Sequence, residues 1–103
     1  MNKELIHTRF AKNLKSYNYA VINLDNNITR AEFVRIINNA FGYTKAAKNV
    51  KFNDVEKNSW YYNDIAIGLE QGYINGRSET TFAPNDNITR QEVAKILTTI
   101  KNI

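Results

Sequence analysis

One seven-residue pattern occurs twice in the chain, as NITRAEF at residues 27–33 and as NITRQEV at residues 87–93. In each copy a Thr precedes a Glu by three positions, and apolar residues follow at helical spacing. This pattern is typical of a capping box, in which the Thr oxygen accepts from the third helical N–H and the Glu accepts from the Thr N–H. It predicts two helix starts with matching structural residues, Thr29 with Glu32 and Thr89 with Glu92.

An arginine, Arg30 or Arg90, takes the first helical position in each copy. The positive end of the helix dipole disfavours a cation there by roughly 0.3–1 kcal/mol, so a recurring arginine indicates a compensating anion. A guanidinium binds a carboxylate or a phosphate through two parallel hydrogen bonds. One interpretation is that both arginines bind an anionic ligand. The other is that each pairs with an acidic side chain at the seam between the repeats.

Helical periodicity extends the prediction to the rest of the chain. Helices are expected at about 2–14, 29–41, 60–71 and 89–101. Gly42 and Gly72 are expected to end two of them, and Asn58 or Ser59 is expected to cap the third. The other segments are expected to form extended loops with room for one rudimentary strand pair. We therefore predict an all-α fold of two pseudo-repeats, each a helix, an extended loop and a capped helix, which stack to bury their apolar stripes.

Composition excludes several classes of protein and site. The 103 residues include no cysteine, which rules out a disulfide scaffold or a thiolate metal site. The net charge of +4 is spread over scattered lysines, whereas nucleic-acid binders usually concentrate charge on one element. No apolar run is long enough to span a bilayer, and the first residues do not resemble a signal peptide. We expect no nucleic-acid partner, no membrane insertion, and either a cytoplasmic protein or a segment of a longer exported one.

The second half of the chain resembles an S-layer homology (SLH) module. The resemblance rests on FNDV at 52–55, Trp60, GYING at 72–76, FAP at 82–84 and ITRQEV at 88–93. The first half matches mainly from Ile22 to Phe41 and resembles a degenerate module. The expected organisation is a degenerate module at 1–42, a linker at 43–51 and a complete module at 52–103.

The resemblance implies a non-catalytic module that anchors an exported bacterial protein to the cell envelope. In Gram-positive organisms such modules bind secondary polysaccharides linked to peptidoglycan, which are often pyruvylated, and three modules typically pack together. Arg30 and Arg90 would then face an acidic sugar group, and further modules in cis or in trans would be partners. The implied location is extracellular, at the cell surface. The alternative is a protein–protein assembly module that kept the fold and lost the glycan.

Three other positions carry competing interpretations. Trp60 is a candidate for stacking on a sugar ring, although its spacing favours a core anchor between repeats; it is kept as a candidate glycan-binding residue. Asp54 is expected to accept hydrogen bonds from loop N–H groups. His7 stands apart from any acidic cluster and is expected to be solvated or to cap a helix. No residue pattern predicts catalysis, a cofactor or a metal ion.

Overall fold

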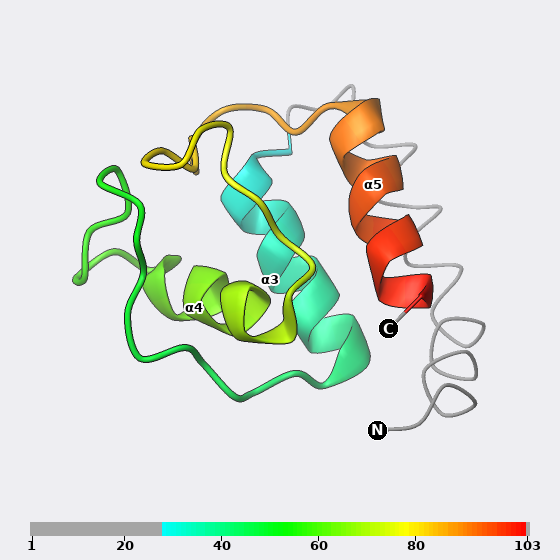
Figure 1. Cartoon of the computed structure of the whole chain (residues 1–103), viewed down its shortest axis with the longest axis horizontal. Coiled ribbons are helices and arrows are strands. Elements are labelled where there is room, and N and C mark those ends of the chain that lie inside the picture. The colour runs from blue at the N-terminus through cyan, green and yellow to red at the C-terminus, as the bar shows by residue number, and fades with distance from the viewer. Residues whose placement is uncertain (1–27, 103) are drawn as a thin grey trace.

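The structure is a computed structural model that describes residues 28–102. Over this range the chain forms three helices and no strand: α3 (Arg30–Phe41), α4 (Tyr62–Gln71) and α5 (Arg90–Lys101) (Figure 1). The all-α prediction is confirmed for this part of the chain. The helix expected at 2–14 and the position of His7 lie outside the described residues. None of the described helices is long and apolar enough to cross a membrane.

Both capped helices begin as a capping box requires. The Thr29 hydroxyl accepts from the Glu32 N–H at 3.1 Å, and the Glu32 carboxylate accepts from the Thr29 N–H at 2.8 Å. At the start of α5 the matching distances for Thr89 and Glu92 are 3.1 and 2.9 Å. Each pair satisfies N–H groups that have no partner inside the helix, so the two helix starts are defined locally.

The glycines that follow α3 and α4 end these helices. Gly42 and Gly72 adopt left-handed backbone angles, with φ of 69° and 79°, a conformation that glycine accepts without strain. The start of α4 differs from the expectation, because its cap is Tyr61 with no side-chain hydrogen bond. Ser59 lies in the preceding turn, where its hydroxyl donates to the Glu56 carbonyl at 2.6 Å. The predicted cap at Asn58 or Ser59 is therefore wrong.

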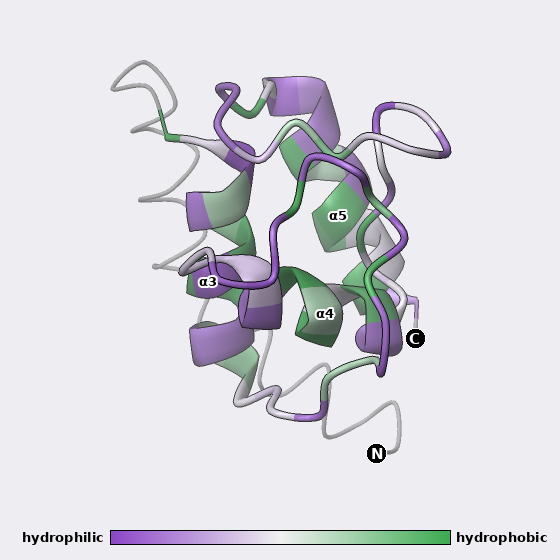
Figure 2. Cartoon of the chain, turned by 90° about the vertical axis from the view of Figure 1, so that its left-hand side faces the viewer, coloured by the Kyte–Doolittle hydropathy of each residue, from purple (hydrophilic) through white to green (hydrophobic). Residues whose placement is uncertain are grey.

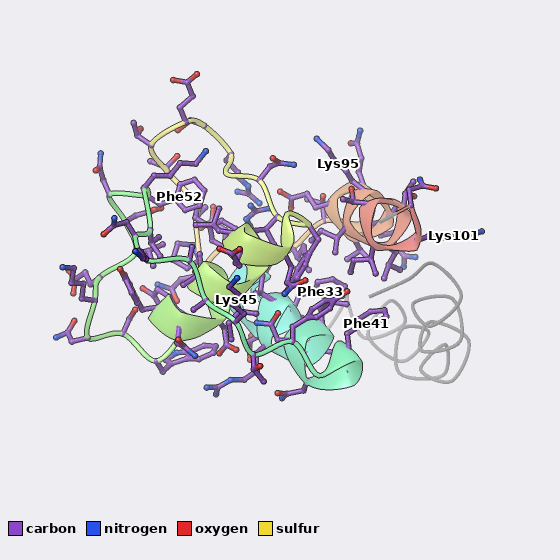
Figure 3. The ribbon with its side chains drawn as sticks, turned by 60° about the horizontal axis from the view of Figure 1, so that its bottom comes forward. Phe33, Phe41, Lys45, Phe52, Lys95 and Lys101 are labelled. Atoms are coloured by element: carbon purple, nitrogen blue, oxygen red, sulfur yellow. The ribbon has the colours of Figure 1, made fainter. Side chains whose placement is uncertain are left out.

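The core lies between the three helices and the loops that connect them. Figure 2 shows that the apolar parts of the helices face inward, and α3 packs directly against α4. The labelled side chains of Phe33 and Phe41 extend from α3 in Figure 3. The fully buried large side chains come from all three helices and the loop after α4: Phe33, Val34, Ile37, Phe41, Ile65, Tyr73, Phe82, Val93 and Ile100.

The loop between α4 and α5 crosses the start of α3 (Figure 1). Thr29 and Asn87 form an isolated antiparallel bridge, and the Ile88 N–H donates to the Ile28 carbonyl at 2.9 Å. The first two N–H groups of α3 donate to the Asp86 and Pro84 carbonyls at 2.9 and 3.0 Å. The loop therefore supplies acceptors that a helix start lacks and holds the first turns of α3 and α5 together.

We expect Gly76→Ala to destabilise the protein by about 3 kcal/mol through overpacking. An added Cβ would lie 2.4 Å from the Ser78 carbonyl oxygen and 2.5 Å from that of Thr81, and neither backbone atom is easily displaced. Gly72→Ala is the matched control, since its Cβ would meet nothing within 4 Å; its left-handed φ costs about 1–2 kcal/mol. Urea unfolding measures both, and equal losses would contradict the packing argument.

Candidate functional site

A cavity of about 100 Å³ opens where α3, α5 and the loop between α4 and α5 meet. Its polar lining comes from Arg30, Asn75, Glu92 and Lys95, and its apolar walls from Val34, Ile74, Phe82, Ile88 and Ile96, with Tyr73 and Gly76 completing the lining. The cavity is smaller than the roughly 300–1,000 Å³ of small-molecule pockets. It therefore suits one small polar substituent better than a whole chain of sugars.

Arg30 lines the cavity from the first turn of α3 and is only 5% exposed. Its Nε donates to the Phe82 carbonyl at 2.8 Å and its Nη2 to the Asn75 carbonyl at 2.9 Å. Its Nη1 forms a salt bridge with Glu92, and its Cζ lies 4.4 Å from the centre of the Phe82 ring. Arg30 thus joins α3 to α5 and to the loop between α4 and α5.

These contacts compensate the cation at the first helical position of α3. Burial lowers the pKa of Arg30, and the nearby charge of Glu92 opposes that shift. The group stays protonated, because arginine does not lose its proton in proteins. Within the described part of the chain, three of the five guanidinium N–H groups have named acceptors. Arg30 therefore keeps two N–H donors that these bonds do not use, and it belongs to the cavity lining.

Glu92 is the acidic centre of the site. Besides Arg30, its carboxylate accepts from Arg77 Nε and Nη2, both at 3.3 Å, and from the Thr89 N–H. Burial would raise the pKa of Glu92, but the hydrogen bonds from Arg77 and Thr89 and the charges of both arginines bring it below its usual value. The hydrogen bond to Glu92 raises the pKa of Arg77, which also bonds Asp86 at 2.7 Å. The capping glutamate therefore also joins two arginines.

Lys95 adds a second positive charge to the cavity lining. It lies on α5 one turn after Glu92, and its side chain extends from the helix surface in Figure 3. It is exposed, unlike Arg30. Because Arg30 and Glu92 neutralise each other, Lys95 gives the cavity lining a net positive charge. No sequence motif pointed to Lys95; its position three residues after Glu92 on one helix face was the available signal.

The other predicted site residues lie elsewhere. Arg90 begins α5 as predicted but is exposed and does not line the cavity. Trp60 is 48% exposed and also lies outside the cavity lining, so the preference for a core position was wrong. A tryptophan just before a helix fits either a core or a surface role, because the pattern does not fix which side of the chain faces the core.

Asp54 accepts hydrogen bonds from two loop N–H groups, those of Phe82 at 2.9 Å and Ala83 at 2.8 Å. Ala83 has a φ of 59°, a left-handed angle that is costly for any residue but glycine. The paired hydrogen bonds hold this angle and aim the Phe82 carbonyl toward Arg30. Asp54 therefore shapes the loop that forms one wall of the cavity.

A buried polar network behind the cavity escaped the sequence analysis. The Tyr73 hydroxyl donates to Asn38 Oδ1 at 2.6 Å, and Asn38 Nδ2 donates to the Asp64 carbonyl at 3.0 Å and to its Oδ1 at 3.3 Å. Arg35 Nε donates to Asp64 Oδ2 at 3.0 Å. The available signal was Asn38, a polar residue one helical turn after Val34 on the apolar side of α3. Over residues 28–102 no acidic or histidine cluster could hold a metal ion.

Residues 51–94 match the family model of the S-layer homology domain. The surface-layer 125 kDa protein of Lysinibacillus sphaericus is 47% identical over 70 residues, which cover 68% of this chain and 6% of that protein. The cellulosome-anchoring protein of Acetivibrio thermocellus is 34% identical over 87 residues, covering 81% of this chain and 20% of that protein. No solved structure is a significant match.

An endoglucanase of Bacillus sp. (strain KSM-635) is also similar, with 34% identity over 67 residues. The match covers 65% of this chain but only 7% of the enzyme. The chain thus spans between 6% and 20% of the length of these three relatives. What they share with it is a short segment that occurs in surface-layer proteins, an anchoring protein and an enzyme.

The two motif arginines should differ sharply in their effect on stability. We expect Arg30→Met to lower the free energy of unfolding by about 3–5 kcal/mol, because it leaves the Phe82 and Asn75 carbonyls without their donor and removes one of the two cations that pair with Glu92. Arg90→Met at the equivalent motif position removes an exposed guanidinium that does not line the cavity, so its loss should be clearly smaller, about 0–1 kcal/mol. Urea unfolding of both variants measures the difference, and similar losses would contradict the distinct roles seen here.

The site should also lose stability in acid. Because the pKa of Glu92 is lowered on folding, its ionised form stabilises the protein above its usual value of 4.5, and this contribution disappears as the pH falls through the lowered pKa. Glu92→Gln should cost about 1–3 kcal/mol at neutral pH. Unfolding measured from pH 7 to pH 3 should show the gap between variant and wild type closing, and a constant gap would contradict this role.

Proposed function

Residues 51–94 of the chain belong to the S-layer homology domain family, and we propose that the chain is a non-catalytic module that anchors an exported protein to the bacterial cell surface. The partner in this proposal is an anionic polysaccharide linked to peptidoglycan, with a pyruvyl or similar carboxylate as the recognised group. The observation that carries the proposal is the small cavity lined by Arg30 and Lys95 with the single carboxylate of Glu92.

The size and charge of the cavity support a carboxylate-bearing substituent as its occupant. The lining has two cations and one anion, so the net charge favours a negative group. The remaining N–H groups of Arg30 match a carboxylate oxygen, and the Lys95 ammonium provides three further donors. The apolar walls formed by Ile74, Phe82 and Ile96 would exclude water around the bound group and strengthen these contacts.

Arg30 has two roles in this proposal: it shapes the cavity through its three acceptors, and it donates to the ligand. Lys95 provides the positive charge that the internal salt bridges do not neutralise. Arg90 and Trp60 remain candidate glycan contacts outside the cavity. Such a division explains how one residue serves both folding and binding.

An assembly module is the second candidate function. It is favoured by one observation, the salt bridge between Arg30 and Glu92, since a structural module needs its motif arginine only for internal pairing. In that case the positive charge of Lys95 would have no bearing on attachment to cell walls. The two candidates are therefore separated by a substitution that leaves Arg30 in place.

We expect Lys95→Gln to weaken co-sedimentation with Gram-positive sacculi by about five- to tenfold, because it removes a charge-assisted contact of about 1–1.4 kcal/mol. Lys101→Gln is the matched control, an exposed lysine on the same helix that does not line the cavity. It should bind like the wild type. Sacculi stripped of their acidic polymer should retain neither variant.

Wild-type protein that sediments equally with stripped and intact sacculi would overturn the glycan proposal. Equal binding by Lys95→Gln and Lys101→Gln would show that the cavity is not where the glycan binds. Circular dichroism on each variant should show unchanged helix content, since both lysines are exposed.

A further inference from the structure

We propose that Arg35 and Trp60 form a second contact for the acidic glycan, on the outer face of α3 and the start of α4. This inference rests on the proposed function and deepens it, because it assigns to Arg35 a binding role that no motif indicates. The ligand class is a sugar that carries a carboxylate. Its carboxylate would meet the guanidinium of Arg35, and its ring would lie against the exposed part of Trp60.

Trp60 is held in place although it is exposed. Among the described residues it is the one large apolar side chain on the surface, with 48% of it exposed. Its ring meets that of Tyr61 edge-on, with centroids 5.4 Å apart, and Tyr61 packs against the core. An indole fixed in this way provides a flat apolar surface at little cost in conformational entropy, which is what stacking on a sugar ring requires.

Arg35 lies on α3, and its guanidinium is held over the Trp60 ring. Its Cζ lies 4.7 Å from the centre of the Trp60 ring, within the range of a cation–π contact. Its Nε donates to Asp64 Oδ2 at 3.0 Å. Asp64 is itself buried and held by Asn38, so the guanidinium is anchored on a rigid support and is not simply a mobile surface cation.

The unused edge of Arg35 is the part that would recognise an anion. Its side chain is 52% exposed, whereas that of Asp64 is 12% exposed. Within residues 28–102, Nη1 and Nη2 have no hydrogen-bond acceptor, because Nε alone takes the bond to Asp64. These two nitrogens present parallel donors that fit a carboxylate. Asp64 offsets part of the charge, so the contact should add a modest increment to binding in the cavity.

Both contacts lie on one continuous framework. Arg35 follows Val34, which lines the cavity, and Asn38 links Asp64 to Tyr73, which lines it too. In our proposal, a polymer with repeated acidic groups contacts the cavity with one group and the Arg35–Trp60 surface with another. Two weak contacts on one chain raise the overall affinity beyond either alone.

Tryptophan fluorescence tests the proposal directly, since Trp60 is the one tryptophan in the chain. The probe is acidic polysaccharide released from Gram-positive sacculi, beside the same polymer with its carboxylates reduced to alcohols. We expect the acidic polymer to change the Trp60 emission and the reduced polymer to leave it unchanged. Arg35→Met should bind the acidic polymer about fivefold more weakly, as judged by sedimentation.

Lys45→Met is the matched control, because it removes an exposed cation that does not contact Trp60; it should retain the wild-type affinity. Trp60→Phe is a second variant that keeps the salt bridge between Arg35 and Asp64. It should also weaken binding. The proposal is overturned if Arg35→Met and Trp60→Phe bind like the wild type and Trp60 emission stays constant at saturation. If Lys95→Gln still loses binding in that case, the cavity proposal stands without the second contact. If the wild type binds no acidic polymer, both proposals are overturned.

Discussion

The described structure depends most on one buried cation, Arg30. A positive charge at a helix start opposes the helix dipole, and taking it out of water costs several kcal/mol unless partners replace the hydration. Here the partners are two loop carbonyls, those of Asn75 and Phe82, and the carboxylate of Glu92. Because these partners come from the loop and from α5, the arginine can be buried only when α3, the loop and α5 are assembled together.

The helix boundaries were predictable because their causes are local. Both capping boxes use residues three positions apart, so α3 and α5 begin close to the expected positions. A left-handed glycine follows α3 and α4, so these two helices end where expected, whereas the start of α4 has no such local signal. The different environments of Arg30 and Arg90 were not predictable. The partners of Arg30 lie 45 to 62 residues away in sequence, and identical motifs carry no information about such distant acceptors.

The same distinction separates the predictable from the unpredictable parts of the candidate site. The sequence pointed to the motif arginines through the repeated pattern, and it predicted loop hydrogen bonds for Asp54 that the structure contains. It gave no reason to choose Lys95 or Arg35, because the importance of each comes from what the fold places beside it. Lys95 is a proposed contact because Glu92 already pairs with Arg30. Arg35 is a proposed contact because it lies between the buried Asp64 and the exposed ring of Trp60. The shared motif thus forms the cavity, and in our proposal Lys95 in its lining and Arg35 outside it add contacts to the ligand.

Backbone and side-chain NMR of the ¹⁵N-labelled chain, titrated with a small acidic fragment of the wall polymer, tests the central claim most directly. The claim is that the cavity binds a carboxylate while Arg30 remains paired with Glu92. It predicts that the largest shifts occur at Asn75, Gly76 and Lys95, and that the Nε–H signal of Arg30 stays protected from exchange with solvent. Shifts confined to the exposed lysines between α3 and α4, with none at the cavity, would contradict it.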